Sequence, residues 1–413
     1  MRRSSRNLYL RMIAAVLAFT MVTAIASLAQ TKQTLFSFNT QAKGVFPNGG
    51  LILDGAGNLY GTTPYGGPAC ASYSGGCGVV YELSPSSGLW KETIVYAFSG
   101  PDGNSPSAGV VFDSHGNLYG TTTDGGTYNK GVVFELTKTS SGWQENVLYS
   151  FTGAADGGYP QDAVVLDSSG NVYGSTYSGG SDNQGTLFEL TPGSGSSWTE
   201  NVLLNFNNLH GTGPSALAFD ASGNLYGTAT NGVADSNHEK GTIYELTPTA
   251  SGWQQSIFFT FYVIYKTGIN PAHGVSFDGA GNLYGTTQGV VMQAGAGDVY
   301  EISPTQQETI LKELQYQLTY GIRNVFTGPI SVDASGNVYG SVYNQDQGAV
   351  VTYDGFVFRV GPAGAETFVF PSLEPADKIY PMGGLAIDSA GNVYGVTRNV
   401  SSNGVPAVFK ITF

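Results

Sequence analysis

Charged residues are scarce in this sequence, and the basic ones are the scarcest. They make up 11% of the 413 residues, with 17 Lys and Arg against 30 Asp and Glu, and histidine occurs only four times. A chain this acidic repels phosphate backbones and anionic lipid headgroups, so we expect neither a nucleic-acid partner nor binding to a membrane surface. It also offers few side chains for acid–base chemistry.

The sequence motifs of common enzyme classes are missing as well. The chain contains no G-x-S-x-G nucleophile turn, no H-E-x-x-H zinc motif and no phosphate-binding P-loop. These are the short motifs whose residue types and spacing would point to a specific chemistry. From the sequence we therefore assign no catalytic residue, no metal ligand and no cofactor.

Residues 1–29 have the pattern of a secretory signal peptide. Four arginines precede an apolar run over residues 12–25, and Ser27-Leu28-Ala29 is a small-x-small cleavage site. The apolar run is shorter than the roughly 20 residues of a membrane-spanning helix. We expect cleavage near Ala29 and a secreted or periplasmic, monomeric chain without a membrane span. With 13 basic and 30 acidic residues left, its net charge is −17.

Cysteine is limited to Cys70 and Cys77, seven residues apart in one glycine-rich loop. In an exported chain, an isolated close pair of this kind predicts a local disulfide. A metal site would need more soft ligands than two, and neither a Cys-x-x-Cys motif nor a neighbouring His is present.

The dominant feature of the sequence is an eight-residue motif, D-x-x-G-N-[LV]-Y-G, which we call the octad. It occurs seven times, and its final glycines are 53–59 residues apart, a period that indicates a repeat architecture. The copies are residues 54–61, 113–120, 167–174, 220–227, 278–285, 333–340 and 388–395.

Each octad predicts a tight hairpin. In the second copy, Asp113 can accept a hydrogen bond from the backbone two residues on, and Gly116 suits a positive φ. Together they give a three-residue loop closed by a left-handed residue, and the Tyr that follows is expected to pack between repeats. Seven aspartates also suggest calcium or catalytic ligands, but a residue that recurs wherever the turn recurs is better explained by the turn.

Four short β-strands are predicted around each octad. They are a small apolar run before the Asp, the run after the Gly, an aromatic-centred run such as Val133-Phe134-Glu135-Leu136, and a run that begins at Trp90, Trp143, Trp198 or Trp253. Seven such antiparallel sheets, arranged radially, make an all-β fold: a single seven-bladed β-propeller over residues 30–413. Residues 306–317 are compatible with a helix, but we interpret them as the outer strand of the fifth blade.

The ring is predicted to close through its first strand. The last repeat ends with its third strand, while residues 33–38 match the fourth-strand pattern of residues 146–151. The amino-terminal strand should therefore complete the seventh blade and cover its exposed edge.

The octad and the residues after it resemble a known family. The run Gly116-Asn117-Leu118-Tyr119-Gly120-Thr121-Thr122, then Gly125-Gly126, then residues 131–137, is similar to the Gloeo/Verruco (GloVer) tandem repeat of exported bacterial proteins. Repeats five to seven depart from it, because they lack the Gly-Gly pair, and Arg359 and Lys410 replace a third-strand Glu. The resemblance implies an exported propeller and no established activity.

The antiparallel order of the strands in each blade places successive turns at opposite ends of the propeller, which gives it two faces. The octad turns lie at one end of every blade, the octad face, and the second-to-third-strand loops and the crossovers between blades lie at the other, the loop face. Because the loops of the loop face vary between repeats, it is the candidate binding face. Three histidines are predicted there, and one of them, His238, lies beside the carboxylates of Asp235 and Glu239. Histidines with carboxylates can bind zinc or transfer protons. These residues are His210, Asp235, His238, Glu239 and His273.

Loop tyrosines are a second candidate group on the loop face. A phenol combines apolar area with a hydrogen-bonding tip, which suits a wet surface that binds sugars or peptides. The candidates are Tyr65, Tyr73, Tyr128, Tyr159, Tyr177 and Tyr343.

Two functions remain open on these grounds. The first is a binding or scaffold module for an extracellular glycan, peptide or protein, and the second is a propeller hydrolase or lyase that acts on an extracellular polymer or lactone. Charged residues pointing into the central channel would favour an enzyme. The small inner-strand residues favour binding: Gly109, Ala163, Ala216, Gly274 and Gly384.

Overall fold

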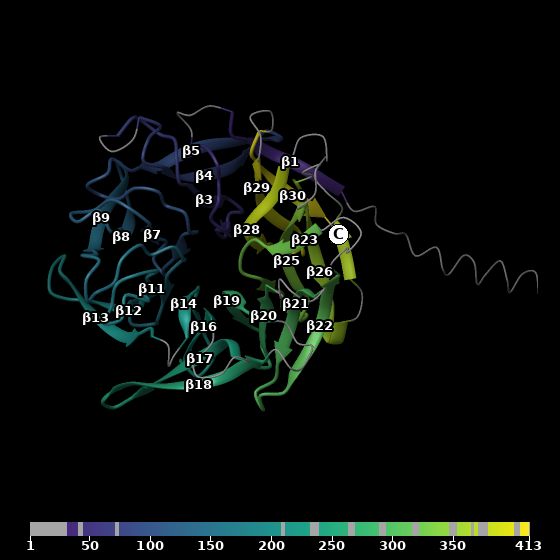
Figure 1. Cartoon of the computed structure of the whole chain (residues 1–413). Coiled ribbons are helices and arrows are strands. Elements are labelled where there is room, and N and C mark those ends of the chain that lie inside the picture. Colours follow the sequence, from purple (N-terminus) through teal and green to yellow (C-terminus); the bar gives the residue numbers. More distant parts are fainter. Residues whose placement is uncertain are drawn as a thin grey trace, which may run out of the picture.

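The computed structural model describes residues 31–39, 44–70, 74–207, 211–231, 239–262, 269–288, 295–315, 322–346, 353–364, 367–370, 379–399 and 405–412. They form seven antiparallel sheets arranged in a ring, as Figure 1 shows. This confirms the predicted seven-bladed β-propeller. The predicted signal peptide lies outside the described residues.

Blades 1 to 3 each contain four strands that follow one another outward from the channel. Blade 1 contains β2 (Ile52–Leu53), β3 (Leu59–Thr63), β4 (Val79–Ser86) and β5 (Leu89–Ala97); blade 2 contains β6 (Val111–Phe112), β7 (Leu118–Thr122), β8 (Val132–Thr139) and β9 (Gly142–Ser150); blade 3 contains β10 (Val165–Leu166), β11 (Val172–Ser175), β12 (Thr186–Pro192) and β13 (Trp198–Asn205).

Blades 4 to 6 repeat this order, with a divided first strand in blades 4 and 6. Blade 4 contains β14 (Thr212–Pro214), β15 (Ala218–Phe219), β16 (Leu225–Asn231), β17 (Glu239–Thr249) and β18 (Gly252–Tyr262); blade 5 contains β19 (Pro271–Phe277), β20 (Leu283–Thr287), β21 (Gly295–Ile302) and β22 (Glu308–Gln315); blade 6 contains β23 (Ile322–Phe326), β24 (Ser331–Val332), β25 (Val338–Asp346), β26 (Tyr353–Val360), the 3₁₀ helix η3 (Pro362–Gly364) and β27 (Thr367–Phe370). The strand predicted within residues 306–317 is confirmed as β22.

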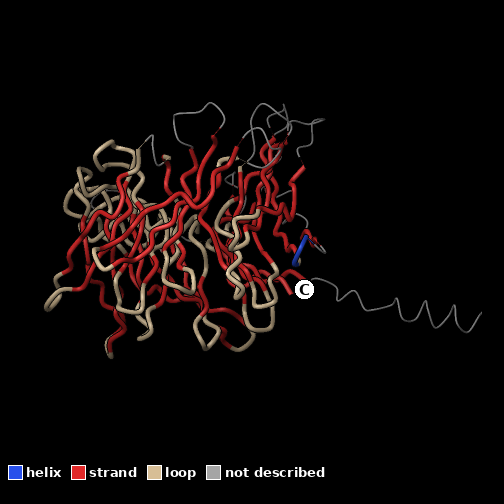
Figure 2. The backbone as a smooth tube through the Cα atoms, turned by 90° about the horizontal axis from the view of Figure 1, so that it is seen from below, coloured by secondary structure: helices blue, strands red, loops and turns tan. Residues whose placement is uncertain are grey.

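Blade 7 closes the ring as predicted. It consists of β28 (Ile379–Ile387), β29 (Val393–Asn399) and β30 (Ala407–Thr412), and its fourth strand is β1 (Thr31–Ser37) from the other end of the chain. β1 pairs antiparallel with β30, from Thr31 opposite Thr412 to Ser37 opposite Ala407. In side view the strands run between turns at two opposite ends of the ring, the octad face and the loop face (Figure 2).

The octads form the predicted turns. In every copy the aspartate Oδ1 accepts the backbone N–H two residues on, at 2.8–3.0 Å, and the fourth residue is a glycine with φ of 77–87°. In every copy the Asn side chain donates a further bond to Oδ2, as in Asn117 to Asp113 at 2.9 Å. The aspartates are therefore bound within their own turns.

The final glycine of each octad is required for space rather than for backbone freedom. The aromatic residue of the third strand lies across it, so that a Cβ added at Gly120 would come within 2.6 Å of Phe134 Cζ, and one at Gly395 within 2.5 Å of Phe409 Cζ. The ring fills the inside of its own blade and is almost fully buried. Residue types on neighbouring strands are thereby coupled, because a bulky ring on the third strand needs a glycine directly opposite it on the second.

The octad tyrosines pack between blades, as predicted. Tyr60 of blade 1 contacts Phe112 of blade 2 edge to face, with ring centroids 5.1 Å apart, and Trp143 of the same blade at 6.4 Å. Trp198, Trp253 and Trp90 occupy the same place against the tyrosines of blades 2, 3 and 7. All four tryptophans of the chain thus fill grooves between blades.

The third-strand charge is paired with the octad tyrosine. Tyr119, Tyr173 and Tyr226 donate their hydroxyls to Glu135, Glu189 and Glu245 at 3.0, 2.6 and 2.7 Å. In blades 6 and 7 the replacement residues change the interaction, because Arg359 and Lys410 lie 5.9 and 5.5 Å from the ring centroids of Tyr339 and Tyr394. A cation over an aromatic face is attracted by the ring quadrupole.

Candidate functional site

The loop face carries an arc of exposed aromatic side chains over blades 1 to 3. Tyr65, Tyr128 and Tyr177 follow the second strands of these three adjacent blades and are 38%, 56% and 61% exposed. Phe46, in the crossover into blade 1, is 37% exposed and lies 6.1 Å from Tyr65. We call these four side chains the aromatic arc.

Two cations border the aromatic arc. Arg398 of blade 7 lies 5.9 Å from the ring centroid of Phe46. Lys130 lies 4.5 Å from the ring centroid of Tyr159, and its Nζ donates to the Tyr159 hydroxyl at 2.5 Å. Positive charge therefore lies beside flat rings on a face of an acidic protein.

The remaining predicted tyrosines do not extend the arc. Tyr73 lies outside the described residues. Tyr343 was wrongly assigned to a loop: β25 continues to Asp346, and the Tyr343 ring packs on Tyr380 of blade 7 at 5.1 Å. The strand extends because Ile322–Phe326 of β23 pairs with it along residues 342–346.

Of the predicted histidine group only His273 can be located in full. His210, Asp235 and His238 lie outside the described residues, and Glu239 is placed only as the first residue of β17. His273 is not on a loop surface but half-buried in β19, in the left-handed region at φ 64°, where its Nε2 donates to the Phe326 carbonyl of blade 6 at 3.1 Å. Burial lowers the pKa of its imidazole.

A polar sector of the channel was missed at the level of the sequence. His273 stands five residues before its octad Asp, and the residues in that position in blades 3 and 4 are Asp162 and Ser215. The other blades have only Gly or Ala there: Gly49, Ala108, Gly328 and Gly383. Aligning the repeats on the octad would have revealed this pattern.

The three residues of the polar sector are held by hydrogen bonds between blades. Ser215 Oγ accepts the backbone N–H of Gly274 at 3.0 Å and shares a short hydrogen bond with Thr228. The Asp162 carbonyl accepts Thr121 Oγ1 at 3.0 Å, and burial raises the pKa of its carboxyl to about 6. The sector therefore places a carboxyl with a raised pKa and an imidazole with a lowered pKa at one level of the channel.

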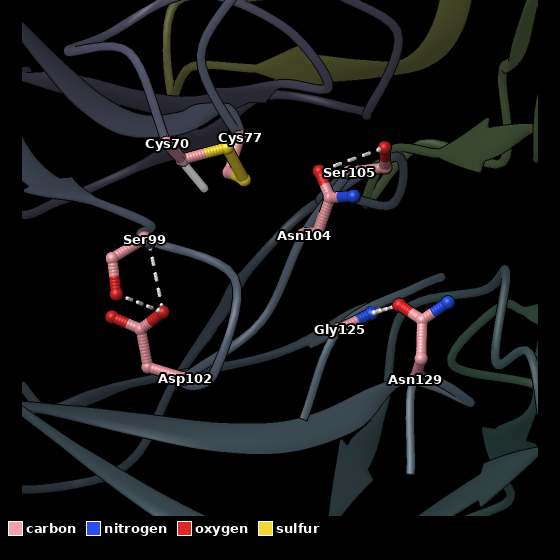
Figure 3. The surroundings of a disulfide bond; sticks show 8 residues. All are labelled: Cys70, Cys77, Ser99, Asp102, Asn104, Ser105, Gly125 and Asn129. Carbon is pink, nitrogen blue, oxygen red and sulfur yellow. Dashed lines mark hydrogen bonds between the residues drawn. A yellow bond between two sulfur atoms is a disulfide. The ribbon is translucent and has the colours of Figure 1, made fainter. Parts of the chain in front are cut away.

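The predicted disulfide between Cys70 and Cys77 is present. Figure 3 shows it beside the crossover from blade 1 to blade 2, where Asp102 accepts hydrogen bonds from Ser99 N and Oγ at 2.8 and 2.9 Å. The Cys77 carbonyl accepts the Ser105 N–H at 3.0 Å, which links the cross-linked loop to that crossover. The disulfide thus stiffens the loop face next to Tyr65.

Comparison with protein families identifies the family of the repeat. The profile of the Gloeobacter/Verrucomicrobia repeat matches residues 20–163, 69–261 and 162–409, which together span almost the whole chain. The chain belongs to this repeat family. No curated protein matches the repeat protein.

Several solved structures are similar to the repeat protein. An ulvan lyase of polysaccharide lyase family PL25, bound to a GlcA-Rha3S saccharide, is 10% identical with a TM-score of 0.51, over 91% of this chain and 95% of the other. PorZ, a surface component of the type-IX secretion system of Porphyromonas gingivalis, is 12% identical with a TM-score of 0.49, over 90% of this chain and 48% of PorZ. The repeat protein thus spans about half of PorZ. A protein of unknown function from Dyadobacter fermentans is 10% identical, with a TM-score of 0.44 and coverage of 92% and 97%.

Metal ligands and long apolar helices are two further features to consider in the repeat protein. Within the described ranges, His, Cys, Asp and Glu nowhere gather in the groups of three or more that a metal ion would need. No helix in that part of the chain has the length and hydrophobicity to span a bilayer.

Carboxyls at the blade edges of the repeat protein have strongly raised pKa values. Burial raises the pKa of Glu145, Glu200 and Glu308 to about 7, and the charges of Asp102 and Asp156 add to the effect on the first two. In all three, Oε1 is buried without a hydrogen-bond partner among the described residues. Folding therefore favours their protonated forms.

We expect the repeat protein to be most stable between about pH 4 and 5. Below pH 4.5 the three glutamates are mostly protonated in both the folded and the unfolded chain, so they do not lower stability. The destabilisation grows as the pH rises and is complete above about pH 7. Burial raises the pKa of Asp278, but hydrogen bonds from Asn282, Tyr284 and Ala280 outweigh it and hold the pKa below 3.8, so the stabilisation is lost only in stronger acid. The same holds for Asp54, Asp113, Asp333 and Asp388. Because the three glutamates are partly exposed to solvent, which screens their charges, together they should lower the free energy of unfolding by on the order of 2 kcal/mol at pH 8.

Thermal denaturation followed by circular dichroism at pH 4.5 and pH 8 measures the difference in stability between the two pH values. The triple variant Glu145→Gln, Glu200→Gln, Glu308→Gln should lose most of it, while Glu313→Gln serves as a control because Glu313 is exposed on the same strand as Glu308. A wild-type melting temperature that is higher at pH 8 would contradict the assignment.

Proposed function

We propose that this protein is an exported binding module that recognises an extracellular glycan through the aromatic arc. The observation that carries the proposal is the exposure of Tyr65, Tyr128 and Tyr177 on three adjacent blades of one face. Flat rings with polar tips suit sugars, because the ring packs on the C–H face of the sugar while hydroxyls bind one another and water. Lys130 and Arg398 beside the arc suit a sugar that carries a carboxylate or a sulfate.

Export is part of this proposal. It is supported by the signal-peptide pattern of residues 1–29 and by the Cys70–Cys77 disulfide, which would not persist in a reducing cytosol.

The test is a glycan array probed with the purified mature protein, followed by calorimetry on the best ligand. The triple variant Tyr65→Ala, Tyr128→Ala, Tyr177→Ala should bind on the order of 100-fold more weakly, if each ring contributes about 1 kcal/mol. The matched control is Leu89→Ala, which removes a side chain of 76% exposure from the β4–β5 turn on the octad face. Unchanged affinity in the triple variant, or binding to peptide arrays alone, would reject a glycan site on the arc.

A hydrolase or lyase is the second candidate, and the polar sector favours it. His273 holds a left-handed backbone that only a few per cent of non-glycine residues adopt, and such strain is common at active sites. Mass spectrometry of the bound glycan after incubation separates the two functions. An intact glycan supports a binding module, whereas shortening that is lost in His273→Asn supports an enzyme.

A further inference from the structure

A pocket of about 570 Å³ lies between blades 6 and 7 on the octad face, away from the aromatic arc. Its walls come from the two octad turns and the strands beside them. They include Val332, Asp333, Tyr339, Arg359, Ile387 and Asp388. Its volume falls in the range of pockets that hold small organic molecules, which is about 300–1,000 Å³.

Four of the other six grooves hold a tryptophan at this place. Tyr339 and Ile387 of the pocket are equivalent to Tyr60 and Phe112 in the groove between blades 1 and 2, where the indole of Trp143 packs edge-on against Tyr60. In the groove between blades 3 and 4, Trp253 packs against Tyr173 with centroids 5.6 Å apart. Two further grooves are filled by Trp198 and Trp90.

Blades 6 and 7 have no tryptophan to share, because the chain's four are all used elsewhere. The floor is also shallower, since Ile387 stands where blades 2, 4 and 5 have Phe112, Phe219 and Phe277. The wall differs too, because Arg359 replaces the Glu of blades 1 to 5. Among the described residues, none supplies an indole at this place in the groove between blades 6 and 7.

We propose that this pocket binds an indole group from outside the chain, either a free indole compound or a tryptophan side chain of a peptide. Arg359 provides a cation for the ring face, as Lys138 does for Trp143 at 5.4 Å in an occupied groove. Asp333 and Asp388 each accept four hydrogen bonds within their own octad turns, so they contribute negative charge to the wall rather than an acceptor for the ligand. One arginine against two aspartates leaves no excess of positive charge, so an uncharged aromatic ring fits better than an anion.

The primary experiment is fluorine NMR titration of the full mature protein with 5-fluoroindole and with acetyl-Gly-(5-fluoro-Trp)-Gly-amide. We expect one saturable site with a Kd of about 0.1–1 mM, the range for a ligand of this size. Ile387→Trp should fill the pocket and abolish binding, and Arg359→Ala should weaken it about tenfold. Glu135→Ala, at the position of Arg359 in a groove filled by Trp198, is the matched control and should leave binding unchanged.

A gain-of-binding variant provides a second line of evidence. Trp198→Ala empties the groove between blades 2 and 3, and a folded variant should bind a second equivalent of the probe. Binding of both probes identifies the indole as the recognised group, and binding of the peptide alone identifies a tryptophan side chain within a polypeptide. Absence of saturable binding at millimolar probe, or binding that Ile387→Trp leaves intact, would overturn the proposal. The glycan assay is independent, because the two sites lie on opposite faces.

Discussion

Gly120→Ala should destabilise the propeller by about 2–3 kcal/mol, although it adds a single methyl group. The added Cβ would lie 2.6 Å from Phe134 Cζ and 3.1 Å from Val110 Cγ1, and both side chains are buried. The ring cannot move away without a rearrangement of the blade, because protein interiors are close-packed. Urea unfolding followed by tryptophan fluorescence measures the loss.

Substitutions of other glycines in the repeat distinguish a steric clash from backbone strain as the cause of the destabilisation. Gly116→Ala places a Cβ in open space but at φ +87°, so only backbone strain of about 1 kcal/mol is expected. Gly55→Ala meets no neighbouring atom and has no positive φ, so its stability should be unchanged. In the double variant Gly120→Ala, Phe134→Leu the two losses should be less than additive, because each substitution relieves the other. Additive losses would show that the ring is not the cause.

Asp278→Ala is expected to cost about 3 kcal/mol, because it removes the one side chain that satisfies a whole octad turn. Its carboxylate accepts bonds from Ala280 N, Asn282 N, Asn282 Nδ2 and Tyr284 Oη at 2.9–3.0 Å. Truncation leaves these donors to water and loosens the tyrosine that packs towards blade 6. The measurement is the midpoint of thermal unfolding at pH 7.

The control for Asp278→Ala is Asp182→Ala, an exposed loop aspartate bonded to its neighbour Ser181. It should change stability by less than about 0.5 kcal/mol. Asp278→Asn should lose less stability than Asp278→Ala, since an amide keeps one accepting oxygen for the backbone N–H groups but replaces the other with a donor. Equal stability of Asp278→Ala and the wild type would refute the structural role of the octad aspartate.

The repeat made the fold predictable from the sequence. Each octad has its own turn chemistry, so Asp113 and Gly116 indicate a hairpin without knowledge of anything distant in the chain. The match of residues 33–38 to residues 146–151 then predicted ring closure, because only one strand lacked a blade. These inferences depend on local rules and on counting.

Contacts between blades were not predictable in the same way. The sequence shows that tryptophan recurs at the start of the fourth strand, but not that Trp143 lies against Tyr60 of the preceding blade, because that depends on how sheets twist and pack. The polar sector at Asp162, Ser215 and His273 was recoverable by aligning positions five before the octad Asp. Its burial and the pKa shifts follow only from the enclosed channel.

The pairing of β1 with β30 has a consequence for the order of events during synthesis. The earliest described strand to be made pairs with β30, which is synthesised about 370 residues later, so the seventh sheet cannot assemble until β30 has been made. Every other strand finds its neighbour within about 55 residues, whereas this pair must bring together segments more than 370 residues apart. Loop-closure entropy grows slowly with length, so the equilibrium cost is modest, but contacts of such long range slow folding. Until that late step, β30 presents an unpaired edge, and the unfinished ring is the form most open to proteolysis and to association with another copy.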